Sequence, residues 1–262
     1  MDSMNDMVTV TSSKKGILHL HLNRPQQLNA LSREVLQTLS HLLETAKADR
    51  TVKAILLTGE GKGFCAGADI KELAALNGEA GTEFARFGQA VMTQLETLGK
   101  PSLAAIHGFA FGGGCELAMA ATLRIAAVGT VFGQPEVKLG VIPGFGGTQR
   151  LSRLIGKGRA LDICLTGRRF TAEEALQWGM ISELATPENL QLRAKEILHD
   201  LTQLGPVALQ CVMTSIQAGY DLPLEAAMTL EAEQFGICCA TQDKQEGVSA
   251  FLEKRAAVFS GE

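Results

Sequence analysis

Aromatic side chains and basic charge are both scarce in this sequence. Phe, Trp and Tyr together make up 5% of its 262 residues, and the formal net charge is -4. Proteins that bind nucleic acid or an anionic membrane surface usually present a basic patch, and stacking on single-stranded bases requires aromatic side chains. The composition therefore argues against a nucleic-acid partner and against a membrane partner.

Disulfide and metal-binding patterns are missing as well. The six cysteines show no CxxC spacing and lie mostly within apolar runs, which is typical of reduced, buried thiols in a cytoplasm-like compartment. The five histidines form no HExxH motif. His19 and His21 alternate along GILHLHL and so share one face of an expected strand. A solvated face is favoured there over a metal site, because two histidines are too few ligands.

No segment resembles a targeting or membrane-spanning sequence. The N-terminal stretch MDSMNDMVTV lacks the apolar core of a signal peptide. The longest apolar stretch, around residues 117 to 128, is interrupted by Thr122 and Arg124 and is too short to cross a bilayer. We therefore expect a cytoplasmic protein.

Three common active-site signatures are also absent. The chain has no GxxxxGK(S/T) phosphate loop, no GxGxxG motif after a first strand and no GxSxG nucleophile elbow. These absences argue against a P-loop protein, a dinucleotide-binding fold and an α/β-hydrolase.

The sequence does contain an alternation of short apolar strands and amphipathic helices. GILHLHL and VKAILLTG are expected strands, and SREVLQTLSHLLETAKAD has helical spacing with Ser32 as its N-cap. TAEEALQWGM is an expected helix with a capping box of Thr171 and Glu174. From about Pro187 nearly every segment is predicted to be helical.

This change of pattern predicts an α/β fold class with two domains. A mixed α/β core is expected over residues 1–200, and an all-helical C-terminal domain over residues 201–262.

Glycines gather in three loops, each after an expected strand, over residues 61–73, 107–120 and 132–150. Glycine lets a ligand or another backbone come close to the peptide groups, and the first N–H groups of a helix have no partner inside it. Two such donors from different loops would form an oxyanion hole. Close packing between backbones explains the glycines alone equally well.

Two glutamates beside these loops favour a catalytic explanation. Glu116 follows GGG and precedes small apolar residues, and Glu136 lies in the mostly apolar turn FGQPEVKLG. Either one alone would be interpreted as a surface residue or a helix cap. Two carboxylates sharing an apolar site would have their proton affinities pushed apart, which provides one acid and one base. Asp69 is expected to cap the helix IKEL, and Lys71 by default is a solvated helix residue.

Four segments in order, AGADIKEL, GGGCELAMA, FGQPEVKLGVIPGFGGTQRL and TAEEALQWGMI, resemble the crotonase superfamily and most closely its enoyl-CoA hydratases. The resemblance covers essentially the whole chain. It implies a spiral of ββα units followed by a helical C-terminal domain that builds homotrimers, often paired into hexamers. It also implies that Glu116 and Glu136 are catalytic and that the N–H groups of Ala68 and Gly113 form the oxyanion hole.

The same resemblance implies where an acyl-CoA substrate binds. The backbone from Ala66 to Ile70 would hold coenzyme A, and Gly144 would lie on the water-binding side. Residues matching positions that reach coenzyme A, the last two from a neighbouring subunit, are Ala66, Ala68, Asp69, Ile70, Lys71, Phe251 and Lys254.

Retention of both glutamates favours hydration of a trans-2-enoyl-CoA to the 3-hydroxyacyl-CoA in fatty-acid or related acyl-CoA degradation, with no metal and no cofactor beyond the coenzyme A of the substrate. The alternatives are an enoyl-CoA isomerase, a specialised 3-hydroxyacyl-CoA dehydratase and, more remotely, a non-catalytic acyl-CoA-binding or RNA-binding member of the same fold. Phe145 departs from the family pattern, in which a small residue is commoner, and is expected to reshape the acyl pocket.

Overall fold

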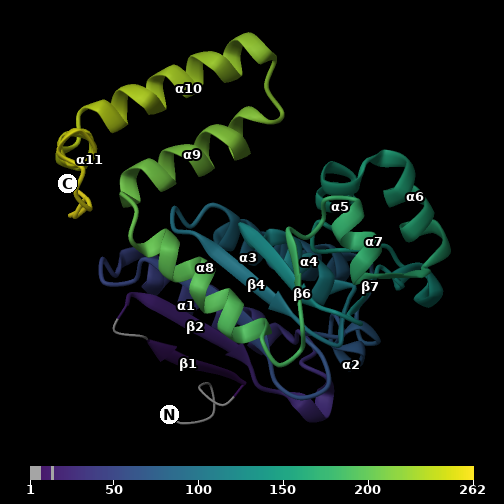
Figure 1. The fold of residues 1–262 in the computed structure, drawn as a ribbon. Helices are drawn as coiled ribbons and strands as arrows, with labels where there is room; N and C mark the ends of the chain where they lie inside the picture. The colour runs from purple at the N-terminus through teal and green to yellow at the C-terminus, as the bar shows by residue number, and fades with distance from the viewer. Residues whose placement is uncertain (1–6, 13–14) are drawn as a thin grey trace.

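The computed structural model of the protein describes residues 7–12 and 15–262. Its larger sheet has six strands in the order β1-β2-β3-β4-β6-β9 (Figure 1). β1 is antiparallel to β2, and the remaining neighbours are parallel. The strands are β1 (Val8–Ser12), β2 (Ile17–Leu22), β3 (Ala54–Gly59), β4 (Ser102–Ile106), β6 (Leu123–Ala127) and β9 (Glu183–Ala185).

Both faces of this sheet are covered, which is why β3 is buried along its whole length. Successive side chains of a strand point to opposite faces. Ile55 and Leu57 therefore join the core shared with α1 (Arg33–Ala48) and α3 (Gly78–Glu96), whereas Ala54 and Leu56 pack beneath α8 (Leu190–Thr202). Figure 1 shows α8 lying across the sheet.

A smaller sheet of three strands, in the order β5-β7-β8, stands beside the larger one. It consists of β5 (Phe109–Phe111), β7 (Val131–Gly133) and β8 (Arg169–Thr171). Short helical elements surround it and carry much of the candidate site. They are η1 (Pro25–Gln27), α2 (Ile70–Leu73), α4 (Gly113–Ala120), η2 (Glu136–Leu139), α5 (Gly147–Ile155), α6 (Lys157–Thr166) and α7 (Ala172–Gln177).

The capping residues predicted from sequence are confirmed. The Ser32 hydroxyl accepts a hydrogen bond from the Val35 N–H at the start of α1. Thr171 and Glu174 form the reciprocal capping box of α7. These local signals need only a few neighbouring residues, and so the sequence contains all the information that they require.

The expectation of a solvated face around His19 and His21 is wrong. Both imidazoles hydrogen-bond the hydroxyl of the buried Thr58, at 2.6 and 2.5 Å, and His21 Nε2 lies 2.7 Å from Glu60 Oε2. Burial lowers the pKa of His19 to about 4. The face is half-buried because α8 covers part of it and supplies His199 to the cavity that His19 lines.

The C-terminal helices are α9 (Pro206–Gly219), α10 (Leu224–Cys239) and α11 (Gln242–Glu253). In Figure 1, α9 and α10 run side by side and extend away from the sheets. Many of their large apolar side chains are exposed, and α10 has no buried residue among those that the structure describes. α8 crosses residue 200, where the domain boundary is expected, and it packs on the sheet.

The α/β class expected from the sequence is confirmed. Among the described residues, none of the helices has the length and apolar character needed to cross a membrane.

Candidate active site

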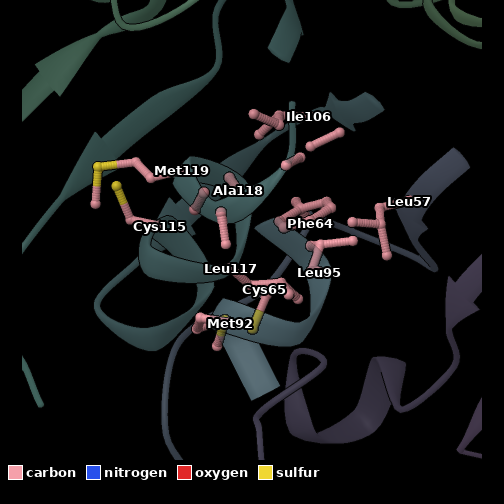
Figure 2. Packing of buried hydrophobic residues seen from close by; sticks show 14 of the residues in the cluster. Leu57, Phe64, Cys65, Met92, Leu95, Ile106, Cys115, Leu117, Ala118 and Met119 are labelled. Carbon is pink, nitrogen blue, oxygen red and sulfur yellow. The ribbon is translucent and has the colours of Figure 1, made fainter. Parts of the chain in front are cut away.

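The three glycine-rich loops meet at one place. Cys65 and Ala110 form a parallel bridge, and the Phe111 N–H donates to the Cys65 carbonyl at 3.0 Å. The Gly112 N–H donates to the Gly133 carbonyl at 2.9 Å. Figure 2 shows the apolar support beneath them, where α4 side chains pack against residues of α3, β3 and β4. The loops therefore converge because β3, β4 and β7 lead their chain segments to the same end of the fold.

Two backbone N–H groups from different loops lie close together in this place. A methyl group on Gly113 would lie 3.2 Å from the nitrogen of Ala68, and one on Gly67 would lie 3.4 Å from the nitrogen of Gly113. Within the described part of the chain, neither the Ala68 N–H nor the Gly113 N–H has a hydrogen-bond partner. Gly113 is the first residue of α4, where intrahelical acceptors are lacking. Two N–H groups from different loops are thus close together and free to bind a ligand.

Glu116 lies in the first turn of α4, is 1% exposed, and is held at one oxygen. Its Oε1 accepts hydrogen bonds from the N–H groups of Phe145 at 2.8 Å and Gly147 at 2.6 Å. Burial, followed by the charge of Glu136, raises the pKa of Glu116 to about 8, although the two N–H donors act in the opposite direction. A carboxyl with such a pKa exchanges protons near neutral pH.

Glu136 begins η2 and faces the same site. Burial raises its pKa to about 7. With its amide turned so that the NH₂ group faces the carboxylate, Gln134 donates to the two oxygens of Glu136 at 3.0 and 3.2 Å. Gly112 has φ of 49°, and a methyl group there would come within 2.7 Å of Glu136 Oε1. Only glycine therefore lets this carboxylate approach α4.

The two carboxyls act as a pair. Each has a pKa raised above its ordinary value of 4.5, and the charge of Glu136 contributes to the rise at Glu116. Close, coupled acids lose their protons in two steps. Two such carboxyls in one site can offer both a proton donor and a proton acceptor.

Because the pKa of Glu116 is raised on folding, its ionisation opposes folding. The folded chain binds more protons than the unfolded chain between the ordinary value of 4.5 and about 8, so the free energy of unfolding falls as pH rises through this range. We expect Glu116→Gln to lose less stability than the wild type between about pH 5 and about pH 8. The difference should exceed roughly 2 kcal/mol, since one pKa unit corresponds to about 1.4 kcal/mol.

Urea denaturation at several pH values measures this difference. Glutamine keeps an oxygen for the N–H groups of Phe145 and Gly147, so only the ionisation is removed. Parallel pH profiles for the two proteins would contradict the assignment of a raised pKa to Glu116.

Phe145 is a core residue rather than a wall of an open pocket. It is 3% exposed, and its ring packs edge-on against Phe84 with ring centres 5.2 Å apart. The ring also fills the space beside Gly88 and lies 3.1 Å from where a methyl group on Gly113 would sit. In the single chain the ring therefore lies in the core, next to Gly113.

The residues expected to hold coenzyme A lie beside α2. Asp69 caps α2 by accepting from the Lys71 N–H at 3.1 Å, as predicted, and pairs with Arg24 at 3.4 Å. Ile70 is 57% exposed, and Lys71 is also exposed. The Ala66 N–H donates to the Leu28 carbonyl at 3.0 Å. These contacts fix the course of the loop and leave α2 open to a ligand.

Two expected site residues lie far from this loop in the single chain. Phe251 is 82% exposed near the end of α11, and Lys254 follows that helix at its C-cap. Figure 1 shows α11 on the opposite side of the molecule from α2. A role for them at this site requires a second subunit. Gly144 precedes Phe145, whose N–H binds Glu116, and its own carbonyl accepts from the Gln89 side chain at 2.8 Å.

Sequence reasoning missed Gln134 and the N–H groups that hold Glu116. Gln134 is fully buried and precedes Pro135 in the motif that contains Glu136. A buried amide next to a candidate catalytic carboxylate was a usable signal. The N–H donors belong to Phe145 and Gly147, which lie 29 and 31 residues after Glu116, and no local sequence pattern predicts their contact with it. Among the described residues, no group of three or more His, Cys, Asp and Glu side chains forms a candidate metal site.

Comparisons with known proteins agree with this geometry. A sequence model described as Enoyl-CoA hydratase/isomerase matches residues 12–262. The chain is 41% identical over 253 residues to the short-chain-enoyl-CoA hydratase of Clostridium acetobutylicum, with 96% of each chain covered. It is 42% identical over 251 residues to the crotonyl-CoA hydratase of Syntrophomonas wolfei, with 95% of this chain and 96% of that one covered.

A solved structure extends the similarity to the fold. The structure of an enoyl-CoA hydratase from Bacillus anthracis matches with a TM-score of 0.94 at 36% identity, over 98% of this chain and 100% of that chain. The architecture is thus the α/β crotonase fold with C-terminal helices, as the motifs predicted. The chain belongs to the enoyl-CoA hydratase/isomerase family.

Proposed function

We propose that this protein is an enoyl-CoA hydratase, a hydro-lyase that adds water to trans-2-enoyl-CoA thioesters and releases 3-hydroxyacyl-CoA. The observation that carries the proposal is the placement of two carboxyls, the buried Glu116 and the half-buried Glu136, beside two N–H groups without a partner among the described residues. The hydratases of Clostridium acetobutylicum and Syntrophomonas wolfei, both about 40% identical over nearly their full length, support the same activity.

In the proposed mechanism, the thioester oxygen accepts hydrogen bonds from the N–H groups of Ala68 and Gly113. These bonds draw electron density from the conjugated double bond, so Cβ becomes electrophilic, and they stabilise the enolate charge that develops on oxygen. Addition of water leaves the oxidation level of the substrate unchanged overall, so no electron acceptor is required.

The two carboxyls place the water and move the protons. A water held between Glu116 and Glu136 over Cβ would be both oriented and activated. Glu116 accepts a proton from this water as its oxygen bonds to Cβ, and Glu136 delivers a proton to Cα. Dehydration runs through the same steps with the roles of acid and base exchanged.

The substrate would be held by the loop and helix beside the oxyanion hole. Ala66, Asp69, Ile70 and Lys71 are proposed to contact coenzyme A, with Lys71 available to its phosphates because it is exposed on α2. Gly144 is proposed to border the water position.

The test is to follow the loss of the conjugated enoyl-thioester absorbance of crotonyl-CoA, and then of longer 2-enoyl-CoA thioesters. We expect hydration, with a chain-length profile that identifies the acyl group preferred. If the protein instead interconverts 3-enoyl and 2-enoyl thioesters without adding water, it is an isomerase. Tight binding of acyl-CoA without either reaction would contradict an enzymatic function.

The C-terminal helices supply a surface for self-association, and we propose a homotrimer that can pair into a hexamer. Large apolar side chains stay exposed along α9 and α10, among them Ile216 at 65%, Leu224 at 76% and Phe235 at 71%. Apolar surface of this kind favours burial against a second subunit. Residues 201–262 would then act as an oligomerisation domain, with Phe251 and Lys254 reaching the coenzyme A of a neighbour.

We expect sedimentation equilibrium to give a mass three or six times that of the 27.9 kDa chain. A stable monomer with full hydratase activity would contradict both the assembly and the contribution from a neighbouring subunit.

The cysteines are all free thiols, which supports a reducing, cytoplasm-like compartment.

A further inference from the structure

The turn that holds Glu116 is itself fastened to α3. Its residues 144–147 supply the N–H groups of Phe145 and Gly147 to Glu116 Oε1. From α3, the Gln89 side chain donates to the Gly144 carbonyl. A second attachment comes from Arg150, on the first turns of α5, whose Nη1 donates to the Phe145 carbonyl at 3.0 Å. The same residue that donates to the catalytic carboxylate therefore accepts from Arg150.

Arg150 is anchored in turn by a carboxylate of α3. Its Nη2 lies 2.7 Å from Glu96 Oε2, and its Nε lies 3.3 Å from the same oxygen. The arginine side chain is 14% exposed and that of Glu96 is 33% exposed. A guanidinium is planar and donates in fixed directions, so one end can hold Glu96 while another holds the Phe145 carbonyl. Two helices and the turn are thus joined through one side chain.

The backbone of the turn is shaped to admit this guanidinium. Gly146 has φ of 102°, and a methyl group there would collide with Arg150 Nη1. A residue with a side chain at this position would both strain the backbone and displace the arginine. Arg150 is thus the arginine of α5 that comes close to the backbone of the turn. The neighbouring Arg153 instead makes an exposed ion pair with Asp221.

We propose that Arg150 and Glu96 are positioning residues for the catalytic pair: they fix the 144–147 turn so that its two N–H groups hold Glu116 in the orientation needed for proton transfer. This inference rests on the proposed hydratase function. Neither residue contacts the reacting atoms in this arrangement. A simple ion pair between α3 and α5 would stabilise the fold without affecting the chemistry, and the two roles predict different results.

The positive charge of Arg150 also affects the pKa of Glu116. The groups that face Glu116 are Glu136 on η2, Arg150 on α5 and the thiols of Cys115 and Cys164, whose pKa values burial raises. Arg150 is the cation among them, and its charge lowers the pKa of Glu116. Removing that charge should move the acidic limb of the kcat profile to higher pH, because the base is then protonated more easily.

The experiment compares Arg150→Met, Arg150→Lys and Glu96→Gln with the wild type, using crotonyl-CoA hydration over a range of pH. Arg150→Met should lower kcat by about a hundredfold with KM within about threefold, since small misplacements of catalytic groups cost about this much. Its acidic limb should move to higher pH. Arg150→Lys keeps the charge but lacks the fork, so kcat should fall by about tenfold with the limb in place. Glu96→Gln should lower kcat and leave the acidic limb of the pH profile unmoved or shift it to lower pH, because it removes a negative charge.

Arg153→Met is the matched control, since it removes an arginine from the same helix without touching the turn, and it should keep the wild-type kcat and pH profile. Thermal unfolding of every variant separates stability from chemistry. Folded Arg150→Met with wild-type kcat and an unmoved limb would overturn the proposal, as would equal effects from Arg153→Met. If Arg150→Met does not fold, Glu96→Gln decides: a lowered melting temperature with unchanged kcat indicates the purely structural role. Absence of hydration by the wild type would instead contradict the function itself.

Discussion

Replacement of Glu136 by glutamine should lower kcat for the hydration of crotonyl-CoA by about a thousandfold, with KM changed by less than about threefold. General acid catalysis by a placed side chain contributes about 10²–10⁴-fold, and an amide cannot deliver the proton that Cα requires. Glutamine has nearly the shape of glutamate, and its amide can still bond Gln134, so binding of the substrate should be preserved. Stopped-flow absorbance at the enoyl-thioester band measures the rate.

Two comparisons make this result specific. Glu188→Gln, at an exposed glutamate in the turn before α8, removes the same charge from the surface and should keep the wild-type rate. Glu116→Gln should be impaired as severely as Glu136→Gln, because the reaction needs both members of the pair. A Glu136→Gln variant with nearly the wild-type rate would show that Glu136 is not the acid.

We expect a large fall in kcat on replacing either glutamate, because the proposed reaction depends on the coupling between them. The N–H groups of Phe145 and Gly147 favour a charged Glu116, while burial and Glu136 oppose it. These opposing effects keep the proton of the pair exchangeable near neutral pH. Burial raises the pKa of Glu116 most, and the closeness of Glu136, which Gly112 permits by lacking a side chain, raises it further.

How far the sequence predicted this site depended on the range of the interaction involved. Ser32, Thr171 and Asp69 were recognised as caps because each acts on an N–H two or three residues away. The proximity of Glu116 and Glu136 was predicted as well, from glycine-rich loops that follow strands. Parallel strands place their carboxyl ends at one edge, so the pattern contains long-range information.

Other features could not be predicted, because they depend on segments brought together only by the tertiary fold. No local signal in the sequence distinguishes Arg150, because its partner Glu96 is 54 residues earlier. Phe145 suggested a pocket wall, yet α3 covers its ring through Phe84 and the space beside Gly88. The face containing His19 was expected to be solvated. The sequence around His19 does not show that α8 covers part of this face, because His199 of that helix is 180 residues further along the chain.

Removal of the Gly113 N–H should be the second severe change. Gly113→Pro deletes this donor, and loss of one oxyanion-hole donor typically lowers kcat by about 10²–10³-fold. Gly113 is the first residue of α4, and proline is well tolerated at this position of a helix, because its N–H is not used within the helix. The variant should therefore fold, as circular dichroism and gel filtration would show, while its hydration rate is measured with crotonyl-CoA.

Gly113→Ala is the control that makes the comparison interpretable. Alanine and proline both introduce a Cβ atom, which would lie 3.1 Å from the Phe145 ring and 3.2 Å from the Ala68 nitrogen. Any loss in Gly113→Ala measures this crowding, and the further loss in Gly113→Pro measures removal of the donor and occupation of its place by the proline ring. Equal rates for the two variants would mean that the Gly113 N–H does not bind the thioester oxygen. A rate for Gly113→Pro at least about a hundredfold below that of Gly113→Ala would establish that the glycine run before Glu116 serves the reaction through its backbone.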